Sequence, residues 1–191
     1  MPLHVASRRL KPETFAQRFG PDAVCLDLTS RGDAPWVRFS PFYPHGEIPV
    51  PFSPGVHSAS VEGIWQGLKV FETADVDPAK FVVTSMKGLK RTVRRFGRVR
   101  GHRRGVTGDE LLGYREARSA IYLPSYRYVL ERCLQAEVAR LRELGAGDAP
   151  VVLLDYETNC DLDDLSKPLS HAGLVKRYLE GAWPTASSTP P

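Results

Sequence analysis

Three polar side chains, Glu62, Gln66 and Lys69, lie within SASVEGIWQGLKVFE (residues 58–72), whose apolar residues have helical spacing. The pattern predicts a helix that is capped by one of its serines and buries its apolar face. Glu62 and Gln66 are four residues apart and Lys69 is three further, so we expect all three on one neighbouring stripe. Two interpretations are open. Glu62 and Lys69 could form a surface ion pair worth about 0–1 kcal/mol. Alternatively, Glu62 is a carboxylate on the wall of a cleft, with a cation nearby, that acts as a base or stabilises positive charge.

A second group of polar residues follows the apolar run VVLLDY, over residues 155–164. Polar side chains just beyond the carboxyl end of a buried strand often face a ligand. Alternating oxygen donors also suit Ca²⁺, but the mid-loop glycine and distal glutamate of an EF-hand are both absent. A ligand-facing loop and a solvated loop therefore both remain open. The oxygen-bearing residues are Asp155, Glu157, Asn159, Asp161, Asp163 and Asp164.

Nine cations and no acid occupy residues 87–104, which we call the basic band. Removing these nine charges from the net charge of +4 leaves −5, so a mildly acidic chain carries one cationic segment. Such a segment suggests an anionic partner, with a solvated face as the alternative. Phe96 is the only aromatic residue in it, which disfavours a base-stacking platform for single strands. A phosphorylated small molecule and a nucleic-acid backbone both remain open. The nine are Lys87, Lys90, Arg91, Arg94, Arg95, Arg98, Arg100, Arg103 and Arg104.

Aromatic residues and metal-binding residue types give weaker patterns. The histidines form no HxH or HxxxH pair, and the three cysteines are far apart. We therefore expect no metal site, no disulfide framework and no cofactor. Glycine-rich nucleotide motifs are absent as well. Most aromatic residues around the first polar group should be core, with one or two left to stack on a heterocycle: Trp36, Phe39, Phe42, Tyr43 and Trp65.

Length and composition are those of an ordinary globular protein, with 191 residues, 42% hydrophobic and 25% charged. This length suits one well-cored domain and is short for two, so we predict one domain over residues 1–181 and a disordered tail over 182–191. No apolar run reaches the roughly 18 residues of a membrane helix. The N-terminal segment lacks the apolar core of a secretory signal. We expect a cytoplasmic protein without membrane contact.

The remaining patterns predict an α+β fold that is mostly helical with a small sheet. Residues 40–57 hold five prolines and two glycines, which indicates an ordered loop. Strands are expected within residues 3–10, 23–29, 36–42 and 151–156. Helices are expected within residues 11–20, 58–72, 77–86, 107–123, 124–145 and 169–181.

In this order the segments resemble a distant branch of the NADAR/YbiA-like superfamily. The family pattern has an aromatic FSNF-like loop, a helix with EHxxQAxK and an Arg-rich region. Two longer helices, a strand ending in an acid with EN…D, and a closing helix follow. The E-x-x-x-Q-x-x-K spacing from Glu62 to Lys69 is the most specific match, and Gly63 stands where the family usually has His. The counterparts here are FSPFYP (39–44), VEGIWQGLKVF (61–71), RVRGHRRG (98–105), LLDYETNCD (153–161) and PLSHAGLVKRYLEG (168–181).

The resemblance implies a NADAR-like fold and an N-glycosidase without metal. Such an enzyme hydrolyses the bond between a ribose carbon and a nitrogen in a phosphorylated nucleoside-like or ADP-ribosyl substrate. Positive charge builds on the ribose during cleavage, so a nearby carboxylate stabilises it and can activate water. The alternative is a non-catalytic protein that binds ADP-ribose or nucleic acid through the basic band.

The resemblance also implies roles for individual residues. Glu62 is the expected catalytic carboxylate, with Asp155 or Asp161 second, in a cleft between the Glu62 helix and the Asp155 loop. Phosphate is expected to be held by Lys69 and by arginines of the basic band, as charge-assisted pairs do, and the base by Trp65 or Tyr43. The full set of expected substrate-binding residues is Lys69, Gln66, Trp65, Tyr43, Arg98, Arg103, Arg104 and Asn159.

Overall fold

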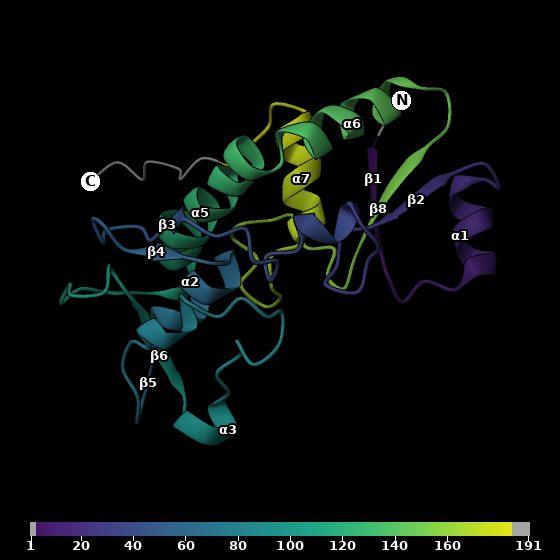
Figure 1. Ribbon diagram of the computed structural model, residues 1–191. Helices are drawn as coiled ribbons and strands as arrows, with labels where there is room; N and C mark the ends of the chain where they lie inside the picture. Colours follow the sequence, from purple (N-terminus) through teal and green to yellow (C-terminus); the bar gives the residue numbers. More distant parts are fainter. Residues whose placement is uncertain (1–2, 185–191) are drawn as a thin grey trace, which may run out of the picture. The chain divides into compact units, whose positions relative to one another are not determined.

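The computed structural model describes residues 3–184 (Figure 1). Its contacts divide the chain into two compact units, one from residues 3–40 and 134–184 and the other from residues 41–133. Both units combine helices with small sheets, so the predicted α+β class is confirmed. Of the predicted tail, residues 182–191, the part from residue 185 onward lies outside the described residues. Within the described part of the chain, no helix has both the length and the apolar character needed to cross a membrane.

The first unit is built on a parallel sheet in the order β1–β8–β2. The central strand is buried along Val151, Val152 and Leu153, which explains why its sequence is continuously apolar rather than alternating. Asp155 pairs in register with Ser7, so polar residues end neighbouring strands at one edge of the sheet. The strands are β1 (Leu3–Ser7), β2 (Val24–Asp27) and β8 (Val151–Asp155).

Three helices complete the first unit: α1 (Pro12–Phe19), α6 (Gln135–Ala146) and α7 (His171–Leu179). α7 packs on β1 and β8 (yellow helix in Figure 1). α1 ends where Gly20 adopts a φ of 90°, as its sequence predicts. α6 continues past Gly145, where the predicted helix ended, to Ala146, and Gly147 is its C-cap.

The predicted strand over residues 36–42 is wrong, because Trp36–Phe39 forms a 3₁₀ turn. Pro35 and Pro41 flank the segment and cannot donate to a strand ladder. In the turn, residues three apart lie above one another, and the rings of Trp36 and Phe39 stack with centroids 6.2 Å apart. The three-residue spacing of Trp36 and Phe39 therefore fits a 3₁₀ turn and not a strand.

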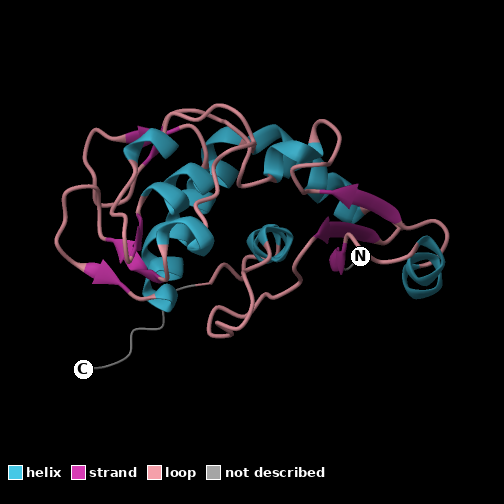
Figure 2. Cartoon of the chain, turned by 90° about the horizontal axis from the view of Figure 1, so that it is seen from below, coloured by secondary structure: helices cyan, strands magenta, loops and turns pink. Residues whose placement is uncertain are grey.

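The second unit holds an antiparallel sheet in the order β5–β6–β7 and a separate two-stranded ladder. Figure 2 shows how short these strands are and how much of the chain between them is loop. The ladder lies inside the proline-rich segment, which is ordered as predicted. The strands are β3 (Ile48–Pro49), β4 (His57–Ser58), β5 (Lys69–Phe71), β6 (Val99–Arg103) and β7 (Leu111–Leu112).

The second unit's helices differ in part from the predictions. A single helical run crosses two π-helical turns, and it begins later than predicted because β7 occupies the preceding residues. The run stops before Leu134, whose φ of −122° and ψ of 24° leave the helical region. The segment predicted as a helix from residue 77 forms only a 3₁₀ turn. The elements are α2 (Val61–Gly67), the turn Pro78–Lys80, α3 (Val93–Phe96), α4 (Tyr114–Ala117), α5 (Leu123–Tyr128), and the π turns Arg118–Tyr122 and Val129–Cys133.

α2 is shorter than its apolar periodicity predicts. Ser60 caps it, with its side-chain oxygen accepting from the Gly63 N–H at 3.0 Å. The helix ends at Gly67, and the next residues enter β5, where Lys69 pairs with His102. The predicted helical stripe is therefore correct for Glu62 and Gln66 and wrong for Lys69, which lies on a strand.

Candidate functional site

Glu62 is a buried carboxylate in the first turn of α2, only 7% exposed. One turn later, Gln66 donates its Nε2 to Glu62 Oε1 at 2.8 Å. The Oε1 of Gln66 accepts the backbone N–H of Arg91 at 3.0 Å. These two bonds require opposite ends of the amide, so they fix its orientation. The interpretation of Glu62 as part of a solvated surface pair is thereby excluded.

The environment of Glu62 disfavours its charge. Burial raises the pKa of Glu62, although the hydrogen bond from Gln66 and the charges of Lys69 and Lys90 act in the opposite direction. Burial also lowers the pKa of Lys69, and the charge of Glu62 only partly offsets this. A carboxylate and an ammonium with pKa values shifted toward each other are common at functional sites, and they also occur in structural ion networks.

Arg91 is the buried member of the basic band. Its Nη1 donates to the carbonyl oxygens of Gln66 at 3.2 Å and Lys69 at 2.6 Å, and its Nη2 donates to that of Asp75 at 2.8 Å. The rings of Phe71 and Phe96 lie 4.9 and 5.1 Å from its guanidinium. Arg91 therefore joins the end of α2 to the start of β5, which are the elements that carry Gln66 and Lys69.

Trp65 lies in an aromatic cluster with a buried histidine. Its ring centroid is 3.8 Å from that of His102, and Tyr114 and Tyr122 lie 6.0 and 5.7 Å away. The Lys69 ammonium is 5.8 Å from the Trp65 ring. Trp65 is half-buried in this cluster, and its predicted contact with a base stays a prediction.

His102 has no counterpart among the predicted site residues. It is 1% exposed, and neither ring nitrogen has a hydrogen-bond partner within the part of the chain that the structure describes. Burial lowers its pKa to about 3, with the charge of Lys69 adding to the effect, so the ring is neutral at physiological pH. The sequence contains no motif around this histidine, and its contact with Trp65 arises only when β6 pairs with β5.

The three arginines predicted to bind phosphate each form an ion pair. The N···O distances are 3.1 Å from Arg98 to Glu72, 2.8 Å from Arg103 to Asp75 and 2.8 Å from Arg104 to Glu110. These acids lie outside the basic band in sequence, so counting charges within the band overestimates its free positive charge. We therefore regard these arginines as weaker phosphate ligands than the sequence suggests.

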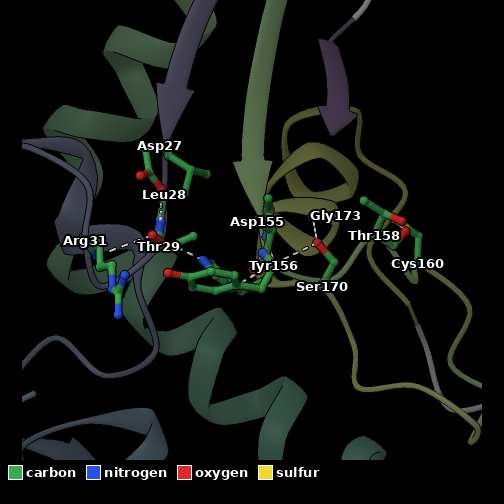
Figure 3. A network of polar contacts seen from close by, with 12 residues as sticks. Asp27, Leu28, Thr29, Arg31, Asp155, Tyr156, Thr158, Cys160, Ser170 and Gly173 are labelled. Carbon is green, nitrogen blue, oxygen red and sulfur yellow. Dashed lines mark hydrogen bonds and ion pairs between the residues drawn. The ribbon is translucent and has the colours of Figure 1, made fainter. Parts of the chain in front are cut away.

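Asp155 is the centre of a buried hydrogen-bond network in the first unit (Figure 3). Its Oδ2 accepts from Ser170 Oγ at 2.8 Å, and it lies 2.9 Å from His171 Nδ1. Backbone N–H groups of Ala172 and Tyr156 donate to Oδ2 and Oδ1 at 3.3 and 2.7 Å. Both carboxylate oxygens are thus engaged, which favours a role in fastening α7 to β8.

His171 completes this network from the other side. Its Nε2 lies 2.9 Å from the carbonyl oxygen of Leu28 and its Nδ1 faces Asp155, so both nitrogens face acceptors. Burial opposes charge on both groups. The attraction and hydrogen bonding between them outweigh burial, so the pKa of His171 is raised and the pKa of Asp155 is lowered. The arrangement is a buried imidazolium–carboxylate pair, whose histidine has no free nitrogen to act as a base.

The acidic loop is organised by Asn159. Its Nδ2 donates to the carbonyl oxygens of Asp164 at 3.0 Å and Lys167 at 3.2 Å, and its Oδ1 accepts the N–H of Asp161 at 2.8 Å. Asp161 is exposed and accepts the N–H of Asp163. These bonds give Asn159 a role in shaping the loop. No group of three or more His, Cys, Asp or Glu side chains suited to a metal ion gathers within residues 3–184.

The predicted site residues fall into two sets. Glu62, Gln66, Lys69 and Trp65 are brought together in the second unit, which also contains Tyr43, whose ring lies 4.9 Å from that of His45. Asp155, Asn159 and Asp161 belong to the first unit. The shared cleft between the Glu62 helix and the Asp155 loop stays a prediction.

Comparison with known proteins gives one match. Residues 7–175 match a protein family described as a family of unknown function, DUF6939. Neither a curated protein nor a solved structure gives a significant match.

Proposed function

The chain belongs to the DUF6939 family, whose function is unknown, and we propose from its site that it is an N-glycosidase. The proposed substrate is a phosphorylated nucleoside-like or ADP-ribosyl compound. The observation that carries the proposal is the buried Glu62 carboxylate, which is held by Gln66 and lies in the field of two lysines. The same contact supports the proposed NADAR-like relationship, because Glu62 and Gln66 are the Glu and Gln of the E-x-x-x-Q-x-x-K motif.

In the proposed reaction, the bond between ribose C1′ and the base nitrogen breaks, and its electron pair passes to the nitrogen. Ionised Glu62 stabilises the positive charge that develops on the ribose. The hydroxyl of a water molecule joins C1′, and the proton of that water passes through Glu62 to the leaving nitrogen. The positive charge of Lys69 favours the ionised carboxylate that this mechanism needs.

Gly63 has a physical explanation within this proposal. A Cβ at this position would lie 2.7 Å from both the carbonyl oxygen of Lys80 and Ser58 Oγ. The helix therefore approaches the neighbouring turn too closely for the histidine that the NADAR/YbiA-like family usually carries at this position. In this chain the side chain that orients the Glu62 carboxylate is Gln66.

The first test compares base release by the wild type and by Glu62→Gln. The amide oxygen of the variant can still accept from Gln66 Nε2, so the change removes the charge with little effect on shape. We expect release from one of ribosylamino-pyrimidine phosphate, ADP-ribosyl-guanine, NAD or common nucleotides, and a loss of about 100-fold or more in the variant. Glu72→Gln, at an exposed acid outside the site, should retain activity. Absence of release, or release that does not depend on Glu62, would contradict the proposal.

A second measurement separates the charge of Glu62 from its contribution to the fold. Because the pKa of Glu62 is raised in the folded protein, its ionised form destabilises the fold at pH values above that pKa. Glu62→Gln should therefore melt at a higher temperature than wild type at pH 7–8. The difference should shrink as pH falls toward the unfolded-state pKa of about 4.3. An equal or lower melting temperature at pH 8 would indicate that burial of Glu62 is not costly.

Non-catalytic binding of ADP-ribose or nucleic acid is the second candidate. The observation that favours it is that Lys87, Arg94 and Arg100 are exposed and form no ion pair with any described residue. Tight binding of a panel member without base release would support this candidate. Nucleic-acid binding would also weaken steeply as salt concentration rises.

A further inference from the structure

A cationic pocket in the second unit takes no part in the steps above. Its volume is about 320 Å³, and its lining includes Lys80, Lys90, Arg91, Thr92 and Arg95 with a single acid, Asp77. We infer that this pocket, rather than the ion-paired arginines of the basic band, binds the phosphate group of a small phosphorylated ligand. Lys80 lies outside the basic band and joins it only through the fold.

The cations Lys80, Lys90 and Arg95 of this pocket contact groups that do not neutralise them. Lys80 Nζ donates to the carbonyl oxygen of Gly88 at 2.8 Å, which orients the ammonium and leaves it other protons to donate. Lys90 Nζ lies 5.6 Å from the Phe42 ring, and the Arg95 guanidinium lies 5.1 Å from the Phe96 ring. Contacts with ring faces retain the cation's full charge.

Asp77, the one acid among the described residues that line the pocket, faces Arg91 rather than the other three cations. Asp77 Oδ2 lies 4.0 Å from Arg91 Nε, and Arg91 also donates to three backbone carbonyls. Lys80, Lys90 and Arg95 form no ion pair with any described residue. Three uncommitted cations around one cavity suit a phosphate monoester, whose charge of about −2 is spread over three terminal oxygens.

The size of the pocket favours a small ligand over a polymer. A volume of about 320 Å³ lies near the lower end of the range of small-molecule sites, roughly 300–1,000 Å³. A nucleic-acid backbone needs a row of free cations along several phosphates. The acid partners of Arg98, Arg103 and Arg104 interrupt such a row.

The pocket is linked to Glu62 by two hydrogen bonds. The backbone N–H of Arg91, a lining residue, donates to Gln66 Oε1 at 3.0 Å, and Gln66 Nε2 donates to Glu62 Oε1 at 2.8 Å. Lys90, another lining residue, acts electrostatically on both Glu62 and Lys69. A phosphate bound here would anchor a ribosyl substrate near the carboxylate, and this link to catalysis rests on the proposed function.

The test measures binding of ribose 5-phosphate by calorimetry at constant ionic strength, with ribose as the ligand that lacks phosphate. We expect ribose 5-phosphate to bind to the wild type and ribose not to bind. The double variant Lys90→Gln/Arg95→Gln should weaken binding at least tenfold, because each change removes a charge-assisted contact. A matched double variant, Arg115→Gln/Arg127→Gln, removes the same charge from the same unit outside the pocket and should bind as wild type does.

The outcomes distinguish this inference from the glycosidase proposal. Glu62→Gln should still bind ribose 5-phosphate, because the change leaves every cation of the pocket in place. Binding that depends on Lys90 and Arg95 without any base release would uphold the pocket and contradict the glycosidase. No binding of ribose 5-phosphate, or equal weakening by both double variants, would overturn the pocket. Tighter, strongly salt-dependent binding of duplex DNA that competes with ribose 5-phosphate would also overturn it in favour of a nucleic-acid surface.

Discussion

Two buried carboxylates, Glu62 and Asp155, have opposite electrostatic environments. Burial is the largest influence on both, and it favours the neutral acid. Glu62 receives one side-chain hydrogen bond, from Gln66, and its pKa is raised. Asp155 faces four donors, one of them the His171 imidazolium, and its pKa is lowered. A carboxyl group whose pKa is raised is a better proton carrier at neutral pH than one whose pKa is lowered, so the contrast favours Glu62 for chemistry and Asp155 for structure.

The Asp155–His171 pair predicts a particular dependence of stability on pH. The pKa of His171 is higher in the folded protein than in the unfolded chain, where it is about 6.5. The protonated ring therefore stabilises the fold fully below about pH 6.5, and this stabilisation is lost as pH rises through the folded-state pKa. The lowered pKa of Asp155 gives stabilisation that is present above about pH 3.9 and lost as pH falls through its folded pKa. We therefore expect the pair to contribute most between about pH 4 and 6.5.

His171→Ala tests this window. At pH 6 the variant should lose about 3–5 kcal/mol of unfolding free energy, because it leaves a buried carboxylate without its charged partner. Urea denaturation of both proteins from pH 5 to 9 measures the difference, which should decrease as pH rises through the folded pKa of His171. The cavity left by the ring contributes at every pH, so a difference that stays constant with pH would show that packing alone accounts for it.

At the level of elements, the short helix α2 depends on close approach to the neighbouring turn. Gly63 and Gly67 are one helical turn apart and face the segment that contains Lys80 and Phe81. A Cβ on Gly67 would lie 2.2 Å from the Phe81 ring. The glycines that weaken the helix in isolation are therefore the residues that allow it to pack, and this packing fixes the position of Glu62.

Substitution of two helical glycines by alanine should have opposite effects. Gly67→Ala should destabilise the protein by about 1–3 kcal/mol through overpacking against Phe81. Gly145→Ala should stabilise it by up to about 1 kcal/mol, because its Cβ would make only an ordinary 3.8 Å contact with Leu3 and alanine favours the helix. Thermal and urea unfolding measure both. Equal effects of the two changes would contradict the close packing of α2.

At the scale of the whole molecule, the two compact units contain different parts of the chemistry. The second unit, formed by the contiguous residues 41–133, contains Glu62, its partners and the cationic pocket. The first unit combines two separate segments and contains the Asp155 network. All of the proposed catalytic and phosphate-binding groups thus lie within the second unit.

This division predicts where amide hydrogen exchange will respond to destabilisation. Ser170→Ala removes the hydroxyl that caps α7 and donates to Asp155, at an expected loss of about 1–2 kcal/mol. Exchange measured by mass spectrometry should increase mainly within residues 3–40 and 134–184. Gly67→Ala should increase it mainly within residues 41–133. Ser166→Ala, in the exposed loop before α7, is the control. Equal increases in both units would show that they open together.

The sequence by itself determined the elements whose signals are local. Gly20 ends α1, α2 is capped by a serine at its start, and the apolar run before Asp155 forms a strand, because each depends on residues adjacent in the chain. The contact between Glu62 and Gln66 was also predictable, since residues four apart on a helix are neighbours. The α+β class follows from the same local patterns.

Only the tertiary structure decided which charges are free and which are paired. Glu72, Asp75 and Glu110 pair with arginines that the sequence shows in a segment without acids. Lys80 joins Lys90 and Arg95 around one cavity, and His102 meets Trp65 through strand pairing. α2 ends at Gly67, where the helix lies against the Phe81 ring, and Lys69 therefore belongs to strand β5. Each of these depends on contacts between segments distant in sequence, and hydrophobic periodicity and charge counts carry no information about such contacts.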